Sequence, residues 1–275
     1  MNEMLVAFRG SGEMASGCAH RLFNAGFSIV MTELARPLAV RRQVSFAQAV
    51  IDGEQVVEGV RAVATDDAGH ALTLASDGII AVYYGNNRPA SFHPDVLVDA
   101  TLAKVNTGTT LVDAPIVIGL GPGFTAGQDV HAVIETNRGH DLGRIYYQGS
   151  AAPNTSEPGA IMGVTRERVL KAPVAGVFQS ELAIGDNIEA GAVFGHIGEV
   201  QLTAKITGVV RGLLLPGTRV QPGTKLGDID PRGDVSYCAT ISDKARTISG
   251  GVLEAILHLK GGGANRRVSG SPGCK

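Results

Sequence analysis

The sequence has little of what several protein classes need. Its aromatic content is 5% and its formal net charge is −2 at pH 7, so it lacks the basic, stacking surface of a nucleic-acid-binding protein. It has no run of about 20 uncharged apolar residues, the length that crosses a bilayer. The first apolar stretch is interrupted at Arg9, before a signal-peptide core can form. We therefore expect a cytoplasmic protein with no nucleic-acid partner and no membrane partner.

Cysteine is also scarce. The three cysteines, Cys18, Cys238 and Cys274, are too few and too scattered for a disulfide framework or a thiolate metal site. Cys18 is expected to pack as a small apolar side chain on a helix. A redox or selenium-handling role for Cys18 and Cys238 is left open, and no metal is predicted.

Glycine, by contrast, is abundant: the 37 glycines are spread through apolar segments, which is typical of tight turns. The chain has 275 residues, and single cores become less common as chains approach about 250–300 residues. We predict a nucleotide-binding domain at 1–165, a β domain at 166–235, a helix that packs back on the core at 236–260, and a disordered tail at 261–275.

The N-terminal segment has the pattern of a dinucleotide-binding βαβ unit. An apolar run at 4–8 is followed by a glycine loop, a helical pattern that ends at Gly26, and a second apolar run at 27–32. That run ends in Glu33, about 20 residues beyond the glycines, where a dinucleotide fold has the acid that binds ribose. The predicted cofactor-binding residues are Gly10, Ser11, Gly12, Glu13, Met14 and Glu33. A glycine turn used only for packing is the alternative, since the Glu13 carboxylate opposes a phosphate at the helix start.

Three arginines, Arg36, Arg41 and Arg42, follow Glu33. They can bind a 2′-phosphate or another anion bidentately, or they belong to a solvated basic loop. The acid and the arginines together leave the choice between NAD and NADP open.

Two later strands are followed by further candidate residues. After a strand at 96–99 come Asp99, Thr101, Lys104 and Asn106, which belong either to a site at the carboxyl end of a parallel strand or to a capped turn. After a strand at 115–120, a second glycine loop with Gly121, Gly123, Phe124 and Thr125 is predicted to form an anion-binding nest. We expect the two glycine loops to hold one phosphorylated ligand between them.

The hairpin that follows contains His131, Glu135 and His140. Their spacing matches no compact metal-ligand motif. Hydrogen-bonded structural roles, or contact with an anionic ligand, are favoured for them.

Residues 171–230 contain one unit twice at an offset of 32 residues, so that Gly176 and Gly185 correspond to Gly208 and Gly217. Short strands of this kind cannot bury a face alone, so the two copies are expected to interlock around a shared core. The pattern resembles the barrel-sandwich hybrid of lipoyl and biotinyl carriers, whose modified lysine lies on the hairpin that joins the halves. That hairpin, at about 197–202, has no lysine here, which favours a docking or ligand-holding module over a carrier.

The predicted fold class is therefore α/β, a Rossmann-like N-terminal domain with a small all-β barrel-sandwich hybrid domain. Apolar residues recur with a period near 3.6 over 242–259, which predicts a final helix. We expect this helix to pack on the N-terminal domain or between the two domains.

Four segments together resemble the YqeB-type accessory proteins of selenium-dependent molybdenum hydroxylase systems: RGSGEMASGCAHRLFNAGF, RPLAVRRQVSFAQAV, GLGPGFTAGQDVHAVIETNRGHDLGR, and GDIDPRG with SDKARTISGGVLEAIL. The N-terminal domain is similar to that of xanthine dehydrogenase accessory proteins. The resemblance implies maturation of a molybdenum hydroxylase, with a molybdopterin dinucleotide or NAD(P) as the nucleotide-type cofactor and the apo-hydroxylase as the partner. An NAD(P)-dependent oxidoreductase and a protein-binding scaffold without a small-molecule site are the alternatives. Whether the chain is an enzyme, and whether it forms a homo-oligomer, is left open.

Overall fold

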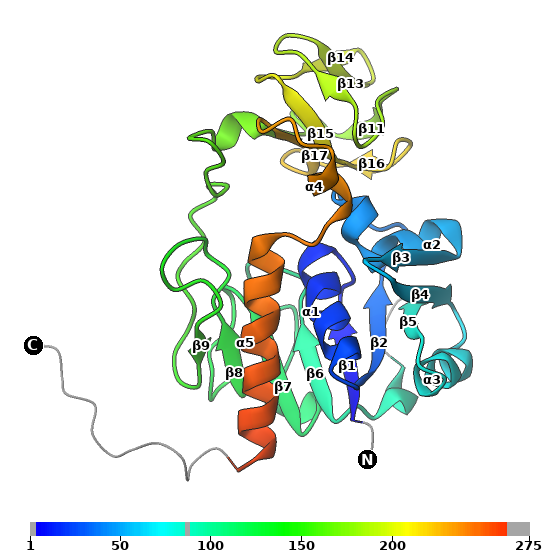
Figure 1. The fold of residues 1–275 in the computed structure, drawn as a ribbon, viewed down its shortest axis with the longest axis vertical. Helices are drawn as coiled ribbons and strands as arrows, with labels where there is room; N and C mark the ends of the chain where they lie inside the picture. The colour runs from blue at the N-terminus through cyan, green and yellow to red at the C-terminus, as the bar shows by residue number, and fades with distance from the viewer. Residues whose placement is uncertain (1–3, 86–88, 263–275) are drawn as a thin grey trace, which may run out of the picture.

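The computed structural model describes residues 4–85 and 89–262, which fold into a large α/β part and a small β part (Figure 1). The large part is built on a nine-stranded sheet with the order β3-β4-β5-β2-β1-β6-β7-β8-β9. The seven inner strands pair in parallel. The edge strands β3 and β9 pair antiparallel to their neighbours.

The strands of this sheet are β1 (Leu5–Arg9), β2 (Ser28–Glu33), β3 (Glu54–Val57), β4 (Val60–Thr65), β5 (Ile80–Tyr84), β6 (Val96–Asp99), β7 (Ile116–Leu120), β8 (Ala132–Ile134) and β9 (Ile145–Tyr146). The α-helices are α1 (Glu13–Asn24), α2 (Ala49–Asp52), α3 (Ala68–Ser76), α4 (Ser236–Ala239) and α5 (Asp243–Lys260). Short 3-10 turns are η1 (Arg42–Val44), η2 (Phe46–Gln48), η3 (Ala90–Phe92), η4 (Leu111–Asp113) and η5 (Arg166–Arg168).

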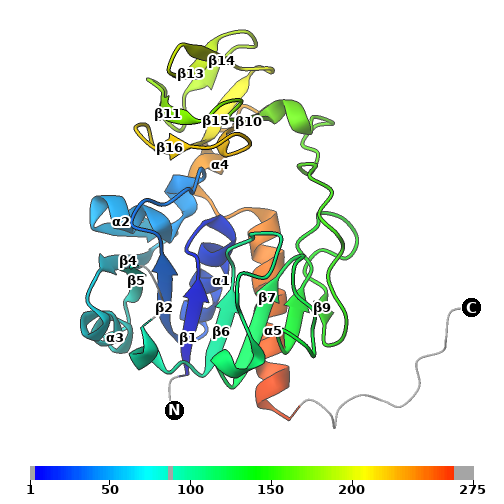
Figure 2. The same ribbon diagram turned by 180° about the vertical axis from the view of Figure 1, so that it is seen from behind.

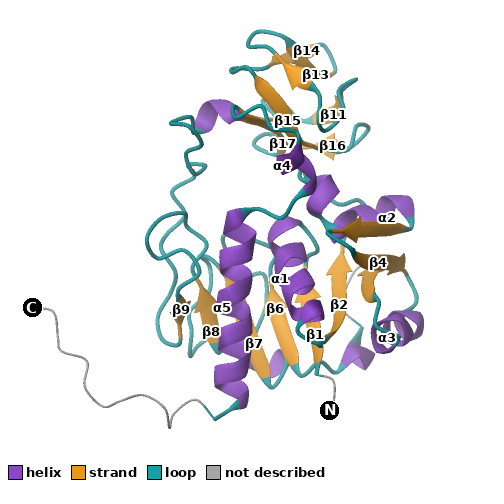
Figure 3. Cartoon of the chain, in the orientation of Figure 1, coloured by secondary structure: helices purple, strands orange, loops and turns teal. Residues whose placement is uncertain are grey.

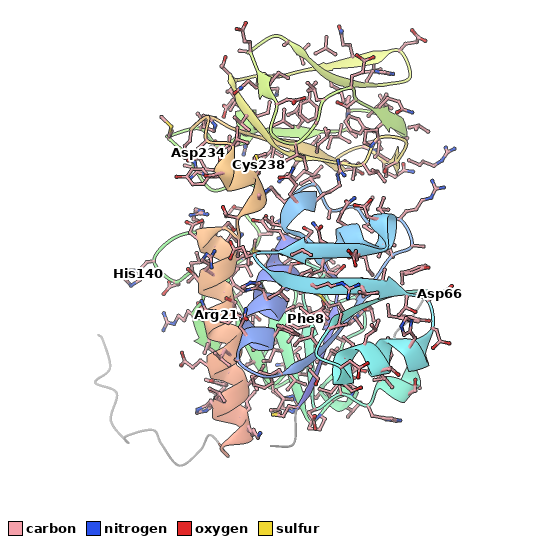
Figure 4. The ribbon with its side chains drawn as sticks, turned by 45° about the vertical axis from the view of Figure 1, so that its right-hand side comes forward. Phe8, Arg21, Asp66, His140, Asp234 and Cys238 are labelled. Carbon is pink, nitrogen blue, oxygen red and sulfur yellow. The ribbon has the colours of Figure 1, made fainter. Side chains whose placement is uncertain are left out.

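Helices α1 and α5 lie side by side on one face of the sheet (Figures 1 and 3). In α1 the buried apolar residues Ala15, Cys18, Ala19 and Leu22 stand at positions i, i+3, i+4 and i+7, the spacing of one helix face. Arg21 reaches from α1 to α5, where its Nε donates to Ser249 Oγ at 2.8 Å (Figure 4). Helix α5 therefore covers nearly the same residues as the final helix expected at 242–259, and it contacts α1.

The other face of the sheet is covered differently. Helix α3 packs against β2, β4 and β5, and Figure 2 shows it at one side of the sheet. Loops bring Phe92 and Phe124 onto this face, where they join a core with Val30 and Val117. The two faces therefore have different cover, long helices on one and mainly a short helix with loops on the other.

The small part consists of two four-stranded antiparallel sheets, ordered β10-β17-β15-β12 and β14-β13-β11-β16. Their strands are β10 (Val169–Lys171), β11 (Gly176–Gln179), β12 (Asn187–Ile188), β13 (Val193–Ile197), β14 (Val200–Thr203), β15 (Gly208–Leu213), β16 (Arg219–Val220) and β17 (Lys225–Asp230). Strands β12 and β16 occupy equivalent places in the two repeats, and each pairs within the sheet formed mainly by the other repeat. Both repeats contribute to one core, with Phe178, Phe194 and Leu226 buried in it, so the predicted interlocking is confirmed.

The predicted fold class is wrong in both parts. A Rossmann-like domain has a parallel sheet whose successive crossovers are helices, but here the antiparallel edges make the sheet mixed, and β5 lies between β2 and the earlier strand β4. The cause is the β3–β4 hairpin, which occupies residues 54–65 where a crossover helix would stand. The β part is not a lipoyl-like barrel either, because its two sheets stay open at β10, β12, β14 and β16.

Arg41 joins the two parts near α4. Its side chain is 2% exposed, and it donates to Glu13 Oε1 at 3.1 Å and to the carbonyl oxygen of Tyr237 at 2.8 Å. Figure 4 shows Asp234 and Cys238 on this same segment, between the large sheet and the β part. A buried guanidinium thus ties the segment after β17 to the start of α1.

Part of the sequence analysis falls beyond the described residues. Of the predicted disordered tail, 263–275 lies outside them, and so does Cys274. The domain boundaries at 165 and 235 stay predictions. Within residues 4–85 and 89–262, no helix combines the length and the apolar character that crossing a membrane requires.

Candidate functional site

A crevice of about 530 Å³ opens where β1, β2, β5 and β6 end. Since these strands are parallel neighbours, the loops that follow them meet at one edge of the sheet. The candidate residues named from the sequence that line it are Gly10, Gly12, Glu13, Met14, Glu33 and Thr101. The sequence analysis did not select the other lining residues, namely Arg9, Thr32, Leu34, Leu38, Ala39, Gly85, Ala100 and Leu102.

The glycine loop after β1 shapes the entrance to α1. Gly10 has a φ of +88°, a left-handed conformation that favours glycine. Gly12 is the N-cap of α1, with φ −69° and ψ −176°, and no side chain caps the helix. The first amides of a helix have no acceptor inside it, so the N–H groups of Glu13 and Met14 are open at the crevice wall, at the positive end of the helix dipole.

The acids near these amides are already engaged. Glu33 Oε2 accepts hydrogen bonds from the amide of Ser11 at 2.9 Å and from its hydroxyl at 2.8 Å. Glu33 Oε1 accepts from the amide of Leu34 at 2.8 Å. Glu13 forms the ion pair with Arg41 described above. Glu33 therefore braces the glycine loop, and Ser11, which is fully buried, directs its amide to protein rather than to a ligand.

An apolar wall stands beside the start of α1. Leu34 and Leu38 are 57% and 51% exposed, although both are large apolar side chains. Met14 and Leu102 line the same crevice. Exposed apolar surface in a concave site with a few polar groups is typical of small-molecule pockets.

The three predicted arginines do not gather at this crevice. Arg41 lies at the junction of the two parts, and Arg42 donates from Nε to the carbonyl oxygen of Leu213 at 2.8 Å. Burial lowers the pKa of both guanidinium groups. Arg36 is exposed. Two of the arginines therefore hold the β part in place, a role that no local pattern could reveal.

The loop after β6 combines structural residues with strained ones. Asp99 is fully buried; its carboxylate accepts from Arg9 Nη1 at 3.0 Å and from Thr101 Oγ1 at 2.7 Å. The Asn106 side chain forms hydrogen bonds with the backbone of its own loop. Asp99 and Asn106 therefore both act within a capped turn. Leu102 and Lys104, however, have φ values of +55° and +70°, a costly conformation for side-chain-bearing residues that is often found at functional sites.

Lys104 has a cationic neighbour that the sequence did not indicate. Burial lowers the pKa of Lys104. Burial also lowers the pKa of Lys244, at the start of α5, and the charge of Lys104 lowers it further, whereas the charge of Glu13 raises it. Lys244 therefore interacts electrostatically with two groups far away in the sequence, Lys104 and Glu13.

The second glycine loop lies outside the lining of this crevice. Gly121 donates its amide to Ile134 O at 2.8 Å, and the amide of Thr125 is bonded to Asp129 Oδ2 at 2.8 Å. A Cβ added at Gly123 would lie 2.8 Å from the backbone of Val105, and Phe124 is buried. This loop packs against the loop after β6 and uses its amides internally, so the two glycine loops do not form one site.

The remaining titratable candidates have structural surroundings. His131 Nδ1 accepts from the amide of Val117 at 3.0 Å, and burial lowers its pKa. Glu135 is 2% exposed and accepts from the amides of Asn137 and Ala152 at 2.7 Å. His140 is exposed on a loop beside α5 (Figure 4). In the described residues, no three His, Cys, Asp or Glu side chains are grouped as a metal site.

The cysteines are shielded. Cys18 is fully buried in α1, and burial raises the pKa of its thiol to about 12. Burial also raises the pKa of Cys238. Such thiols are poor nucleophiles at neutral pH, which agrees with the packing role expected for Cys18.

Comparison with known proteins returned one curated relative. No protein-family model matches the chain. Uncharacterized protein YqeB of Escherichia coli (strain K12) is 50% identical over 260 residues, which are 93% of this chain and 48% of that protein. The chain therefore spans about half the length of this relative. The match confirms the likeness to YqeB-type proteins, but the relative's name assigns no function.

Three solved structures align with much of the chain at low similarity. A succinylglutamate desuccinylase/aspartoacylase from Rhodobacter sphaeroides is 15% identical with a TM-score of 0.23, covering 81% of this chain and 86% of that one. An aspartoacylase family protein from Mesorhizobium loti is 14% identical with a TM-score of 0.27, covering 83% and 85%. The ectoine utilization protein EutE (DoeB) from Ruegeria pomeroyi is 13% identical with a TM-score of 0.23, covering 82% and 56%. These values are too low to transfer an activity.

We correct the predicted role in maturing a selenium-dependent molybdenum hydroxylase, which no comparison supports, because the relative's name assigns no function. We therefore retain neither that role nor its oxidoreductase and scaffold alternatives.

Proposed function

We infer that this chain is a small-molecule-binding protein whose crevice at the ends of β1, β2 and β6 takes an organic anion. The observation that carries this proposal is the uncapped first turn of α1. Its amides at Glu13 and Met14 stand at the wall of a crevice of about 530 Å³. Helix N-termini of this kind bind phosphate or carboxylate groups through N–H donors and the helix dipole.

The charge balance around that turn supports an anionic ligand. Glu33 is engaged with Ser11 and Leu34, and Glu13 is paired with Arg41. Neither acid therefore presents an unpartnered carboxylate. The charge of Glu13 also acts on Lys244, a cation at the start of α5.

The shape of the site indicates the rest of the ligand. Its volume lies within the range of about 300–1,000 Å³ that small-molecule pockets occupy. Leu34 and Leu38 provide apolar surface on one side. A ligand with an anionic group at α1 and an apolar body against the leucines satisfies both features. The dinucleotides predicted as cofactors have an anionic group and a flat ring, so they belong in the test panel.

The test uses calorimetry and thermal shift with NADH, NADPH, AMP and short dicarboxylates, on the wild type and three Gly12 variants. A Cβ at Gly12 meets no atom within 4 Å, and the backbone there is extended, so side chains fit without strain. Gly12→Asp and Gly12→Asn place a capping oxygen on the amides that the ligand needs, whereas Gly12→Ala leaves them open.

We expect a panel member to bind the wild type and Gly12→Ala, and to bind Gly12→Asp at least about tenfold more weakly. Gly12→Asn should fall between them, because it competes for the amides without adding charge. Thermal stability should be unchanged or slightly raised in Gly12→Asp, since Asp is a good N-cap. No binding by any panel member, or undiminished binding to Gly12→Asp, contradicts the proposal.

A further inference from the structure

A second hollow lies in the β part, away from the crevice. It has a volume of about 650 Å³, and residues of both β10 and β14 line it. These two strands occupy equivalent positions in the two repeats, and each is the edge of its sheet. The hollow is therefore a groove between two sheet edges, with Leu170 and Leu202, both nearly buried, at its floor.

Strand β14 is an unprotected edge. Natural edge strands are usually blunted by charge, proline, a bulge or a very short length. The sequence of β14, Val-Gln-Leu-Thr, has no charge and no proline, and it is four residues long, whereas the edge strands β12 and β16 have two. An open edge of this kind accepts an added strand through its free backbone groups.

The hydrogen bonds next to β14 show which groups are free. Ala204 donates its amide to Ala192 O at 2.9 Å and accepts from the amide of Gly191 at 2.8 Å, so its backbone faces β13. Backbone direction alternates along a strand. The N–H and C=O groups of Gln201 and Thr203 therefore point away from β13, toward the open side.

The groove has a positive rim. Arg166, Lys171 and Lys205 line it, and no acidic residue is among its lining residues. Two acids lie beyond the lining: Glu157, which pairs with Arg166 at 2.7 Å, and Glu167, whose pKa is lowered in part by the charge of Lys205. Both are on the exposed surface, and in the described residues Lys171 has no carboxylate within 4 Å.

We propose that this groove binds an extended acidic segment of a partner protein, which adds as a strand to β14. Backbone bonds to Gln201 and Thr203 supply the pairing, Leu170 and Leu202 receive alternate apolar side chains, and Lys171 and Lys205 select acidic ones. A second copy of this chain is a poorer occupant, because it would bring the same cations against the same rim. This inference does not rest on the ligand of the crevice.

The experiment measures fluorescence anisotropy of a labelled short peptide of alternating valine and glutamate, titrated with the full chain. A peptide of alternating valine and lysine is the charge control. Gln201→Pro removes the outward amide at a position where an edge strand tolerates proline, and Gln201→Ala is the matched control that keeps the amide. A peptide N-methylated at alternate residues removes the same bonds from the ligand side, without altering the protein.

We expect the valine–glutamate peptide to bind and the valine–lysine peptide not to. Gln201→Pro and the N-methylated peptide should each weaken binding by about tenfold or more, Gln201→Ala should not, and added salt should weaken it. No binding of the valine–glutamate peptide overturns the proposal, as does equal binding of the lysine peptide or of the N-methylated peptide. Self-association that Gln201→Pro abolishes in sedimentation would assign the edge to a second copy and also overturn it.

Discussion

Replacement of Gly17 by alanine should destabilise this protein, although the same change stabilises most helices. Gly17 lies where α1 comes closest to α5: an added Cβ would lie 2.7 Å from the Cβ of Ala245 and 3.4 Å from Ile241 Cγ2. Carbon atoms pack at about 3.5–4.0 Å, so α5 would have to move by most of an ångström. Alanine has no rotamer that avoids the contact.

The sign of the effect follows from two opposing magnitudes. Alanine is favoured over glycine inside a helix by about 1 kcal/mol. Overpacking a dense core costs about 1–3 kcal/mol, so we expect Gly17→Ala to lower the free energy of unfolding by about 1 kcal/mol, and by 2 at most. Gly250→Ala, in α5, is the matched control, because its nearest neighbour to an added Cβ is Arg21 Nη1 at 3.9 Å. The free energy of unfolding of Gly250→Ala should be higher than that of the wild type by about 0.5–1 kcal/mol.

Urea denaturation followed by the helical circular dichroism signal measures both variants. The double variant Gly17→Ala with Ala245→Gly moves one methyl group from α5 to α1 and should restore near-wild-type stability. Its coupling energy should reach about 2 kcal/mol, as for residues in contact. If Gly17→Ala stabilises the chain as Gly250→Ala does, the close approach of the two helices is refuted.

Three further predictions test other parts of the structure. Burial tends to raise the pKa of Asp228, but the charges of Lys225, Arg211 and Arg168 outweigh it and hold the pKa at about 2. The carboxylate therefore stabilises the fold above its ordinary pKa of 3.8, and this stability is lost as the pH falls toward 2. Asp228→Asn should lower the free energy of unfolding by about 3–5 kcal/mol at neutral pH. In urea titrations at several pH values it should also reduce the loss of stability between pH 3.8 and 2. An unchanged loss in this range would contradict the role given to the Asp228 carboxylate. Cys18, with its pKa raised to about 12 by burial, should resist thiol reagents at neutral pH in a chain with Cys238→Ser and Cys274→Ser and react only on unfolding, so that rapid labelling of the native protein would disprove its burial. Arg41→Met should lower the free energy of unfolding by about 3–5 kcal/mol. It should also speed amide hydrogen exchange at 236–241, because Tyr237 and Glu13 lose the donor that they share. Exchange as slow as in the wild type would argue against this link.

Much of the local structure could be predicted from the sequence, because the signals that specify it lie a few residues apart. The apolar run, glycine loop and helix around Gly12 form β1 and α1, and the run that ends in Glu33 forms β2. The offset of 32 residues in the β part matches equivalent strands, such as β11 at Gly176 and β15 at Gly208. Periodicity and turn chemistry are enough for such elements.

Only part of the candidate site could be predicted from such local signals. Glycines that open a helix can be recognised locally, and Gly10 and Gly12 do line the crevice. The hydrogen-bond partners of Glu33 and Arg41 could not be recognised locally, since Ser11 and Tyr237 lie 22 and 196 residues away from them in the chain. The exposed leucines and Lys244 likewise became relevant only once α5 and the loop after β2 were placed.

Sequence by itself determined β1, α1, β2, the last helix and the spacing of the two repeats, because these depend on short-range backbone and side-chain preferences. Tertiary structure alone decided that β5 inserts between β2 and β4, that Arg41 and Arg42 serve the junction, and that the edges of β10 and β14 flank one groove. The physical reason is that burial and hydrogen-bond satisfaction act between segments far apart in the chain. A charged or glycine-rich motif therefore acquires its role from the surface against which it packs.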